Sequence, residues 1–249
     1  QDAGITDFML IEKGGGFGGT WYWNRYPGAS CDIEAYVYLP LLEETGFVPR
    51  QKYTNAEETL EYCEVLAQRY RLHEHALLQT QVRQVVWQES SRRWQVVTDR
   101  GDQLQARFVI HSNGPLNRPK LPAIKGIDQF KGHTFHTSRW DYAYTGGTTF
   151  GDLSQLADKR VAVIGTGATA VQCVPHLAAS AKALYVFQRT PSSIDVRDNQ
   201  PTNPDWISKQ TPGWQKRRQT NFESIMSGLP VKEDFVGDGW TEAFRNLFG

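Results

Sequence analysis

The chain of 249 residues can hold one large domain or two small ones. Lysine plus arginine and aspartate plus glutamate each number 27, so the formal net charge is zero. This balance argues against a protein that binds nucleic acid or an anionic membrane mainly through bulk charge. The apolar runs, such as residues 8–11 and 161–164, are far too short to span a bilayer. We therefore expect neither a nucleic-acid nor a membrane partner.

The cysteines and histidines predict no covalent or metal framework. Cys31, Cys63 and Cys173 are odd in number and widely spaced, which fits neither a disulfide scaffold nor a zinc pattern. We therefore expect a reducing, cytoplasmic location. His133 and His136 are spaced as metal ligands can be, but no cysteine or carboxylate cluster joins them, so no metal site is expected.

The first apolar run of the chain ends in an acid, Glu12. In a dinucleotide-binding βαβ unit, an acid at the end of the second strand bonds the ribose hydroxyls, about 20 residues after the glycine-rich turn. Only 11 residues precede Glu12, too few to hold the first strand and its turn. Glu12 is therefore either an ordinary strand-end carboxylate or the ribose ligand of a truncated nucleotide fold. We favour truncation at both ends, because residues 245–249 stop within an expected helix.

A first glycine cluster, Gly14-x-Gly16-x-x-Gly19, matches the dinucleotide fingerprint letter by letter. That fingerprint needs a helix directly after it, whose N-terminus faces the pyrophosphate. The residues that follow are Thr-Trp-Tyr-Trp and then Pro27, so we expect no helix to begin there. The cluster is interpreted as a loop, which either covers part of a cofactor or lies at the surface.

The middle of the chain predicts one helix and a β-meander. Residues 57–70 have apolar positions at helical spacing, whereas 82–87, 94–98 and 103–110 read as strands separated by turns. Glycine and proline punctuate residues 113–122, which we expect to be irregular.

A second glycine motif, residues 165–170 (Gly-Thr-Gly-Ala-Thr-Ala), has the context that the first one lacks. It follows a strand expected over 160–164, opens a helix expected over 168–179, and precedes a strand expected over 183–188. Arg189 lies 24 residues after Gly165, where an arginine suits the 2′-phosphate of NADPH and an acid would suit NADH. A purely structural glycine turn is the alternative, but the order of elements favours an NADPH site.

From residue 199 onward the chain is polar and rich in Pro, Trp, Lys and Arg, with helical stretches around 214–224. The short basic run Lys216-Arg217-Arg218 is interpreted as the solvated face of a helix.

Composition and spacing alone do not assign a structure or function to one further pattern. Phe130-x-Gly132-x-x-x-His136-x-x-x-Trp140-Asp141 resembles the FxGxxxHxxxW(P/D) signature of type I Baeyer–Villiger monooxygenases, and every fixed position is met. The final Trp-Asp pair favours that branch over the related flavin-containing monooxygenases and N-hydroxylases. His136 could also have a structural role, bonding backbone at a domain junction.

Other stretches agree with this family in order and spacing. Residues 18–34 resemble its flavin-covering segment, and 52–53, 113–116 and 189–191 also follow the family pattern. Asn113-Gly114 departs slightly, because the family usually has Thr-Gly or Ser-Gly there. The resemblance covers nearly the whole chain and is weakest after about residue 200.

The resemblance implies an α/β fold with two Rossmann-like dinucleotide-binding domains, for FAD and NADPH, and a helical insertion in the NADPH domain. The expected division is a partial FAD-binding domain over 1–118, a linker with the signature over 119–145, the first half of the NADPH-binding domain over 146–198, and an incomplete helical insertion over 199–249.

The resemblance also implies a reaction. NADPH would reduce FAD, and one oxygen atom of O2 would be inserted next to the carbonyl of a small-molecule ketone to give an ester or lactone. Two alternatives remain open: a flavin-containing N- or S-monooxygenase, and an NADPH-binding module without oxygenase activity.

The family's site residues map onto positions of this chain. Asp32 matches the active-site acid, although a turn cap is the simpler alternative for an aspartate here. Its catalytic arginine partner lies further along the family's chain, so this chain is expected to be catalytically incomplete. The aromatic residues among the expected cofactor contacts could also be plain core residues. The expected cofactor-binding residues are Glu12, Thr20, Trp21, Tyr22, Trp23, Ser30, Cys31, Asp32, Tyr38, Val82, Gly165, Thr166, Gly167, Ala168, Thr169, Ala170, Gln172, Arg189 and Thr190.

Overall fold

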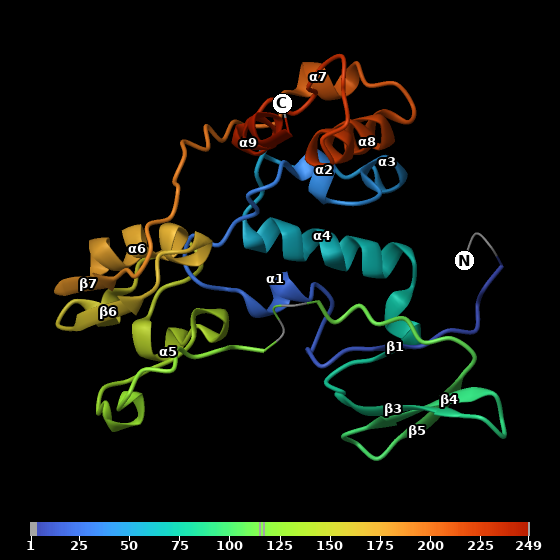
Figure 1. The fold of residues 1–249 in the computed structure, drawn as a ribbon, viewed down its shortest axis with the longest axis horizontal. Helices are drawn as coiled ribbons and strands as arrows, with labels where there is room; N and C mark the ends of the chain where they lie inside the picture. Colours follow the sequence, from blue (N-terminus) through green and yellow to red (C-terminus); the bar gives the residue numbers. More distant parts are fainter. Residues whose placement is uncertain (1–3, 115, 117, 249) are drawn as a thin grey trace. The chain divides into compact units, whose positions relative to one another are not determined.

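The computed structural model describes residues 4–114, 116 and 118–248, which form two compact units (Figure 1). The first unit contains the residues up to Trp23 together with Cys63–His136, and the second contains Asn24–Tyr62 and the residues from Thr137 onward. Helix α4 (Ala56–Arg69) contributes residues to both. The units divide the chain at different places from the expected functional domains, whose boundaries stay a prediction.

In the first unit, a short parallel pair places Glu12 at a strand end. Strand β1 (Leu10–Ile11) pairs with β2 (Ala76–Leu77), and the Glu12 amide donates to the Leu77 carbonyl at 3.0 Å. Glu12 thus lies where an acid can face a ribose, at the end of a parallel strand. β2 follows the 3-10 helix Leu72–His75, and it is too short to produce a sequence pattern.

The expected β-meander is present in the same unit. Its strands β3 (Val82–Gln88), β4 (Arg93–Thr98) and β5 (Gln103–Ala106) form one antiparallel sheet in the order β3-β4-β5. The third strand ends earlier than expected, at Ala106 rather than 110. Its partner explains this, because Ala106 already pairs with Trp94 and β4 begins at Arg93.

The helix expected over 57–70 is α4, and its packing follows from its sequence. Tyr62 and Ala67 are fully buried, whereas acidic residues occupy the first turn, where they favour the positive end of the helix dipole. The Asn55 side chain accepts a hydrogen bond from the Glu58 amide at 2.8 Å and so caps the helix start.

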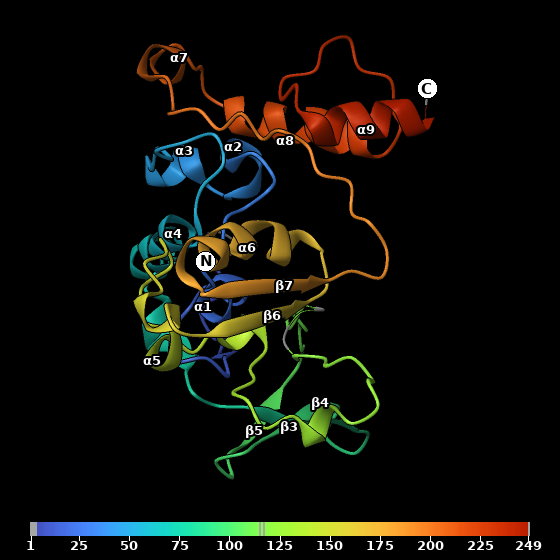
Figure 2. The ribbon, with the colours of Figure 1, turned by 90° about the vertical axis from the view of Figure 1, so that its left-hand side faces the viewer.

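In the second unit, the expected strand–helix–strand arrangement is confirmed. Strand β6 (Arg160–Ile164), helix α6 (Ala168–Ser180) and strand β7 (Ala183–Phe187) follow in order, and β6 pairs with β7 in parallel (Figure 2). Such pairing requires a crossover, which α6 supplies. One-turn elements precede β6: the 3-10 helices Ile127–Gln129 in the first unit and Thr137–Arg139 and Ser154–Leu156 in the second, and α5 (Tyr142–Thr145).

The second unit also contains five helices from two distant parts of the sequence. The N-terminal pair is α2 (Ala35–Tyr38) and α3 (Leu42–Thr45), and the C-terminal set is α7 (Pro204–Ser208), α8 (Trp214–Met226) and α9 (Gly239–Phe248). Helix α8 confirms the helical stretch expected around 214–224, and α9 confirms the helix expected near the final residues.

Side chains of α3 and α8 satisfy each other's helix ends. The buried Gln215 amide accepts from the Leu42 amide at 2.8 Å and donates to the Leu39 carbonyl at 2.6 Å. In return, the Glu43 carboxylate accepts from the amides of Gly213 at 2.7 Å and Gln215 at 2.9 Å. Helix termini leave backbone groups without intrahelical partners, so these bonds allow helices of only one turn to persist.

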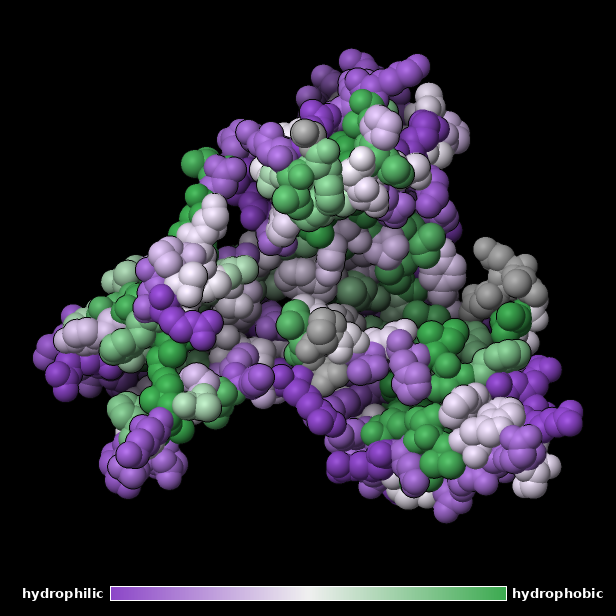
Figure 3. Space-filling model, in the orientation of Figure 1, coloured by the Kyte–Doolittle hydropathy of each residue, from purple (hydrophilic) through white to green (hydrophobic). Residues whose placement is uncertain are grey.

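Hydrophilic and hydrophobic side chains are interspersed over the face seen in Figure 3. Large apolar residues are also exposed, among them Ile164 and Phe187 at the ends of β6 and β7. Within the described part of the chain, no helix combines the length and apolar character needed to cross a membrane.

Candidate functional site

The turn between β6 and α6 leaves open space beside its backbone. Gly165 has φ +107°, a conformation that other residues rarely adopt, and a Cβ on Gly165 or Gly167 would meet no atom within 4 Å. Gly167 is the N-cap of α6, and no side chain there caps the helix. The positive end of a 13-residue helix therefore faces a surface that glycines keep clear, which suits a dinucleotide pyrophosphate.

The segment after β7 is bonded to this turn. The Thr166 hydroxyl accepts from the Gln188 amide at 3.1 Å and donates to the Thr190 carbonyl at 3.4 Å. The Ser192 hydroxyl donates to the Thr166 carbonyl. Arg189 is exposed within this segment, so the structure brings together the glycine turn and the arginine expected to meet a 2′-phosphate.

Helix α6 also holds the segment that carries Asp32, residues 26–34, which we call the aspartate loop. The Gln172 amide nitrogen donates to the Ser30 carbonyl at 2.9 Å, and its oxygen accepts from the Tyr26 hydroxyl at 2.8 Å. Both the nitrogen and the oxygen of the Gln172 side-chain amide are therefore hydrogen-bonded to protein groups. The other expected contacts on the first turns of α6 are Ala168, which is exposed, Thr169, which is half-buried, and Ala170, which is buried.

The aspartate loop approaches α6 so closely that a glycine is required. Gly28 has φ +80°, and a Cβ there would lie 2.6 Å from the Gln172 carbonyl oxygen. Further along, the Cys31 amide donates to the Thr54 carbonyl at 2.9 Å. Burial, with a smaller contribution from the Asp32 charge, raises the pKa of the Cys31 thiol to about 12. Asp32 itself is half-buried, whereas Cys31 is only 4% exposed.

The far end of the loop carries a buried carboxylate that the sequence did not single out. Glu34 is fully buried, and its carboxylate accepts from Arg218 Nε and, at 2.8 Å, from Arg218 Nη2. Interpreting residues 216–218 as a solvated helix face was therefore wrong for Arg218, whose side chain is 14% exposed, although Lys216 and Arg217 are exposed. The pair joins residues 184 positions apart, so no local pattern could predict it.

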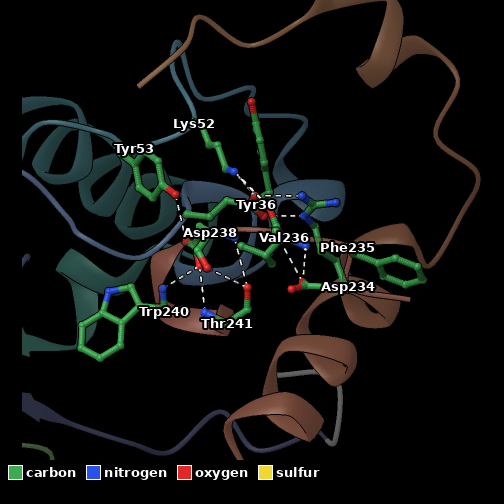
Figure 4. A network of polar contacts seen from close by, with 12 residues as sticks. Tyr36, Lys52, Tyr53, Asp234, Phe235, Val236, Asp238, Trp240 and Thr241 are labelled. Carbon is green, nitrogen blue, oxygen red and sulfur yellow. Dashed lines mark hydrogen bonds and ion pairs between the residues drawn. The ribbon is translucent and has the colours of Figure 1, made fainter. Parts of the chain in front are cut away.

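Further polar contacts surround this pair (Figure 4). The Lys52 ammonium lies 3.9 Å from Glu34 Oε2 and donates to the Val236 carbonyl at 3.0 Å. The Tyr53 hydroxyl donates to Asp238 Oδ2 at 2.9 Å, and Asp238 Oδ1 accepts from the Thr241 amide at 3.1 Å near the start of α9. The network connects the aspartate loop, residues 52–53 and the C-terminal helices within one unit.

In the first unit, the glycine cluster accommodates an aromatic ring. Cβ atoms on Gly14 and Gly15 would lie 3.0 and 2.9 Å from atoms of Tyr22. Glu12 Oε1 accepts from the Gly14 amide at 2.6 Å. The expectation that no helix begins after the cluster was wrong, because α1 (Thr20–Trp23) starts there. Positive φ at Gly18 and Gly19 allows the chain to wind, but only for one turn.

The remaining expected cofactor contacts are more scattered. Thr20 is exposed, whereas Trp21 and Trp23 are half-buried in α1. Val82 begins β3 and is exposed, and Tyr38 ends α2 with 39% of its surface exposed. Their roles toward a cofactor stay predictions.

Residues at both ends of the Baeyer–Villiger signature make local contacts. In the first unit, a Cβ on Gly132 would lie 2.5 Å from the Phe130 ring, so this ring in its present position lies over a glycine. In the second unit, Asp141 caps α5 by accepting from the Tyr144 amide at 3.2 Å. The Trp140 indole donates to the Thr145 hydroxyl at 3.1 Å. His136, the last residue of the first unit, is half-buried.

Within the described residues, no group of three or more His, Cys, Asp or Glu side chains could hold a metal ion. The candidate site residues are a strand-end acid and aromatic residues in the first unit, and a glycine turn and the aspartate loop in the second.

Comparison with known families decides the lineage. A family model described as "Pyridine nucleotide-disulphide oxidoreductase" matches residues 1–218. The chain belongs to this family. Nucleotide-binding oxidoreductases of this kind use parallel strand–helix–strand units, which β6, α6 and β7 form here.

Named relatives within this family confirm the resemblance to Baeyer–Villiger monooxygenases. "Neopentalenolactone D synthase" of Streptomyces avermitilis is 57% identical over 99% of this chain and 42% of its own length. "Baeyer-Villiger monooxygenase ATR8" of Stachybotrys chlorohalonatus is 54% identical over 97% of this chain and 39% of its own length. The chain thus spans about two-fifths of the length of the curated relatives it matches.

Solved structures of similar proteins support the same resemblance. The polycyclic ketone monooxygenase from the thermophilic fungus Thermothelomyces thermophila superposes with a TM-score of 0.89 at 44% identity, over 96% of this chain and 40% of that one. The structure titled "OTEMO complex with FAD and NADP (form 3)" gives a TM-score of 0.76 at 36% identity, over 91% of this chain and 42% of that one.

Proposed function

We propose that this chain supplies cofactor-binding parts of a flavin-dependent monooxygenase that inserts one oxygen atom of O2 next to a ketone carbonyl. The product would be an ester or lactone. The observation that carries the proposal is the attachment of the aspartate loop to α6, the helix of the open glycine turn, through Gln172. The names of the relatives, which include Baeyer–Villiger monooxygenases and a ketone monooxygenase, support this reaction class.

The second unit fits NADPH. The backbone at Gly165 and Gly167 is open, the N-terminus of α6 favours the pyrophosphate, and Arg189 supplies a positive charge for the 2′-phosphate. Thr166 would help to fix the segment that carries Arg189, because it bonds both Gln188 and Thr190. The FAD- and NADP-bound neighbour supports the same pair of cofactors.

The first unit fits the ribose end of FAD. Glu12 directly follows the parallel strand β1, and its carboxylate is already oriented by the Gly14 amide. Aromatic residues of α1 would pack against the flavin, because such rings bury a large apolar surface.

Bound FAD and NADPH would supply the electron transfer and oxygen activation, whereas the protein orients reactants and holds charge. Asp32 would act as the active-site acid, presenting its carboxylate from a loop that is bonded at both ends. The half-buried position of Asp32 strengthens its electrostatic effect compared with a fully solvated carboxylate.

Two further elements belong to this proposal. The chain would form parts of two Rossmann-like domains, with residues 199–249 as a helical insertion in the NADPH domain. The location would be the cytoplasm, which suits Cys31, Cys63 and Cys173 as free thiols.

The first test is a visible absorption spectrum of the complete purified protein, followed by anaerobic addition of NADPH. A flavin band at about 450 nm that bleaches with NADPH supports the two-cofactor enzyme. A protein that stays colourless after incubation with FAD contradicts it and favours an NADPH-binding module.

Product analysis then separates the two oxygenase classes. An ester or lactone from a ketone supports the proposal, whereas an N- or S-oxide from an amine or sulfide would assign the chain to the other class.

A further inference from the structure

The buried ion pair at the end of the aspartate loop has geometry that fixes orientation. Both oxygens of Glu34 accept from one guanidinium, through Nε and Nη2 of Arg218. A fork-to-fork pair of this kind defines the plane and direction of the carboxylate, which a single ammonium cannot do. Burial raises the pKa of Glu34, and the charges of Arg218 and Lys52 oppose that shift.

The guanidinium of Arg218 is itself held in place by aromatic rings. It lies 5.2 Å from the centre of the Trp206 ring and 5.8 Å from that of Tyr36. Trp214 completes the cluster, with its ring centre 5.7 Å from that of Trp206. Cation–π contacts and packing therefore restrict Arg218 to a narrow set of positions.

The aspartate loop is consequently fixed on both sides of Asp32. Gln172 of α6 holds Tyr26 and Ser30 before it, and Arg218 of α8 holds Glu34 after it. Glu34 is also the N-cap of α2, but its side chain makes no capping bond, so its carboxylate is committed to Arg218.

We propose that Arg218 is a positioning residue that, through Glu34, sets the orientation of Asp32 in the active site. The inference rests on the proposed monooxygenase function. It gives the C-terminal helices a role in the reaction, because Arg218 on α8 then controls a carboxylate that it does not itself contact.

Stability alone is a weak explanation for this pair. Replacing a buried ion pair by apolar groups of similar volume is often neutral or stabilising, whereas removing one partner is costly. Misplacement of a reacting group by about 1 Å can lower a rate roughly 100-fold. A pair that fixes direction is therefore better explained by the geometry of Asp32 than by the folding free energy.

The experiment uses four variants of the complete protein loaded with its cofactors. Arg218→Met removes the fork and leaves Glu34 buried beside Lys52 alone. The double variant Arg218→Met/Glu34→Gln removes both charges and keeps similar volumes. Arg218→Lys retains a charge without the fork, and Lys216→Met changes an exposed residue two positions earlier on α8 as the matched control.

Three quantities are measured on each variant: the melting temperature, the rate of flavin reduction by NADPH, and the coupling. Coupling is the fraction of consumed NADPH that yields oxygenated ketone and water. The uncoupled remainder transfers the two electrons of NADPH, with two protons, to O2 and gives hydrogen peroxide.

We expect Arg218→Met to lower both the melting temperature and the coupling, the latter at least fivefold. The double variant should recover the melting temperature but not the coupling. Arg218→Lys keeps the charge and loses the fork, so it should lower the melting temperature less than Arg218→Met does and give intermediate coupling. Lys216→Met should match the wild type. A separation of stability from coupling in this pattern supports a positioning role.

A purely structural role predicts a different pattern. If the double variant recovers the coupling together with the melting temperature, or if Arg218→Lys couples as well as the wild type, the proposal is wrong. If the proposed monooxygenase function itself is wrong, the result differs from both of these patterns. The wild type would then show no flavin band or no bleaching by NADPH.

Discussion

Residues 14–19 and 165–170 are two turns that both fit the spacing of the dinucleotide fingerprint and yet have different structures. The first leads into the one-turn helix α1, and its glycines make room for the Tyr22 ring. The second leads into the 13-residue α6, and a Cβ on Gly165 would meet no neighbouring atom. The first turn is thus filled from within the chain, whereas the second is open toward a ligand.

The difference shows that spacing of glycines does not define a phosphate site. A long helix supplies aligned amides and a dipole at its start, and a single turn supplies very little of either. The sequence context distinguishes the two turns, because strands of five residues flank α6 whereas β1 has only two residues.

The largest effect should come from adding one methyl group to the second turn, at Gly165. Gly165→Ala forces an L residue to φ +107°, which costs about 1–3 kcal/mol or a local rearrangement of the turn. We expect NADPH to bind roughly 10- to 100-fold more weakly, as measured by titration of the complete protein.

Gly16→Ala is the matched change in the first turn. A Cβ on Gly16 would make an ordinary contact, 3.7 Å from the Tyr22 ring, so NADPH affinity should change less than roughly twofold. Equal losses in the two variants would contradict the assignment of the second turn as the NADPH site.

Replacing the arginine after β7 should have the next largest effect. Arg189→Gln removes the charge expected to meet the 2′-phosphate, and charge-assisted hydrogen bonds are worth about 1.5–3 kcal/mol. Because Arg189 is exposed, we expect the lower end of this range: NADPH affinity should fall roughly tenfold and NADH affinity should not change, so the preference for NADPH over NADH decreases.

Arg160→Gln is the control for this change, because Arg160 begins β6 and lies at the opposite end of the strand from the turn. If Arg189→Gln weakens the binding of NADPH and NADH equally, the arginine supports the structure of the turn and does not bind the 2′-phosphate.

These contrasts also show what could be predicted from the sequence. The strand–helix–strand unit, the meander and α4 were predictable, because their periodicity extends over several residues and their caps are local. The open turn was predictable for the same reason, since strand, glycines, helix and Arg189 all lie within one short stretch.

Other features depend on contacts between distant residues. The helices α2 and α3 have four residues each, and the Gln215 side chain of α8 bonds the backbone at the end of α2 and at the start of α3. Glu34 and Arg218 pair across 184 positions, and a basic run on a helix usually faces solvent. Sequence patterns predict segments that are stable locally, whereas buried polar pairs require the three-dimensional structure.

A smaller effect, on stability, should come from disturbing the packing of Tyr22 against the first turn. In Gly15→Ala the new Cβ would lie 2.9 Å from the Tyr22 hydroxyl, so the ring must shift, at a cost of about 1 kcal/mol. Tyr22→Phe removes that hydroxyl, and the double variant should recover most of the lost stability. Thermal unfolding of the two single variants and the double variant measures the coupling. Additive losses would mean that the ring does not fill this turn.

The smallest change tests whether α6 is rigid behind the second turn. Cys173 is fully buried in α6, and burial raises the pKa of its thiol to about 11. Only the thiolate reacts with iodoacetamide, so a raised pKa moves the onset of labelling to higher pH. In the native protein labelling should therefore stay much slower than that of an exposed thiol, because the Cys173 thiol is both covered by protein and protonated. Thr20→Cys, at the exposed start of α1, supplies a matched reporter on the first turn and should react as a free thiol does. The labelling rate of Cys173 could instead rise with pH and level off near 9.0, the ordinary pKa of a thiol. Cys173 would then react through local unfolding, and α6 would be less firmly packed than its buried face indicates.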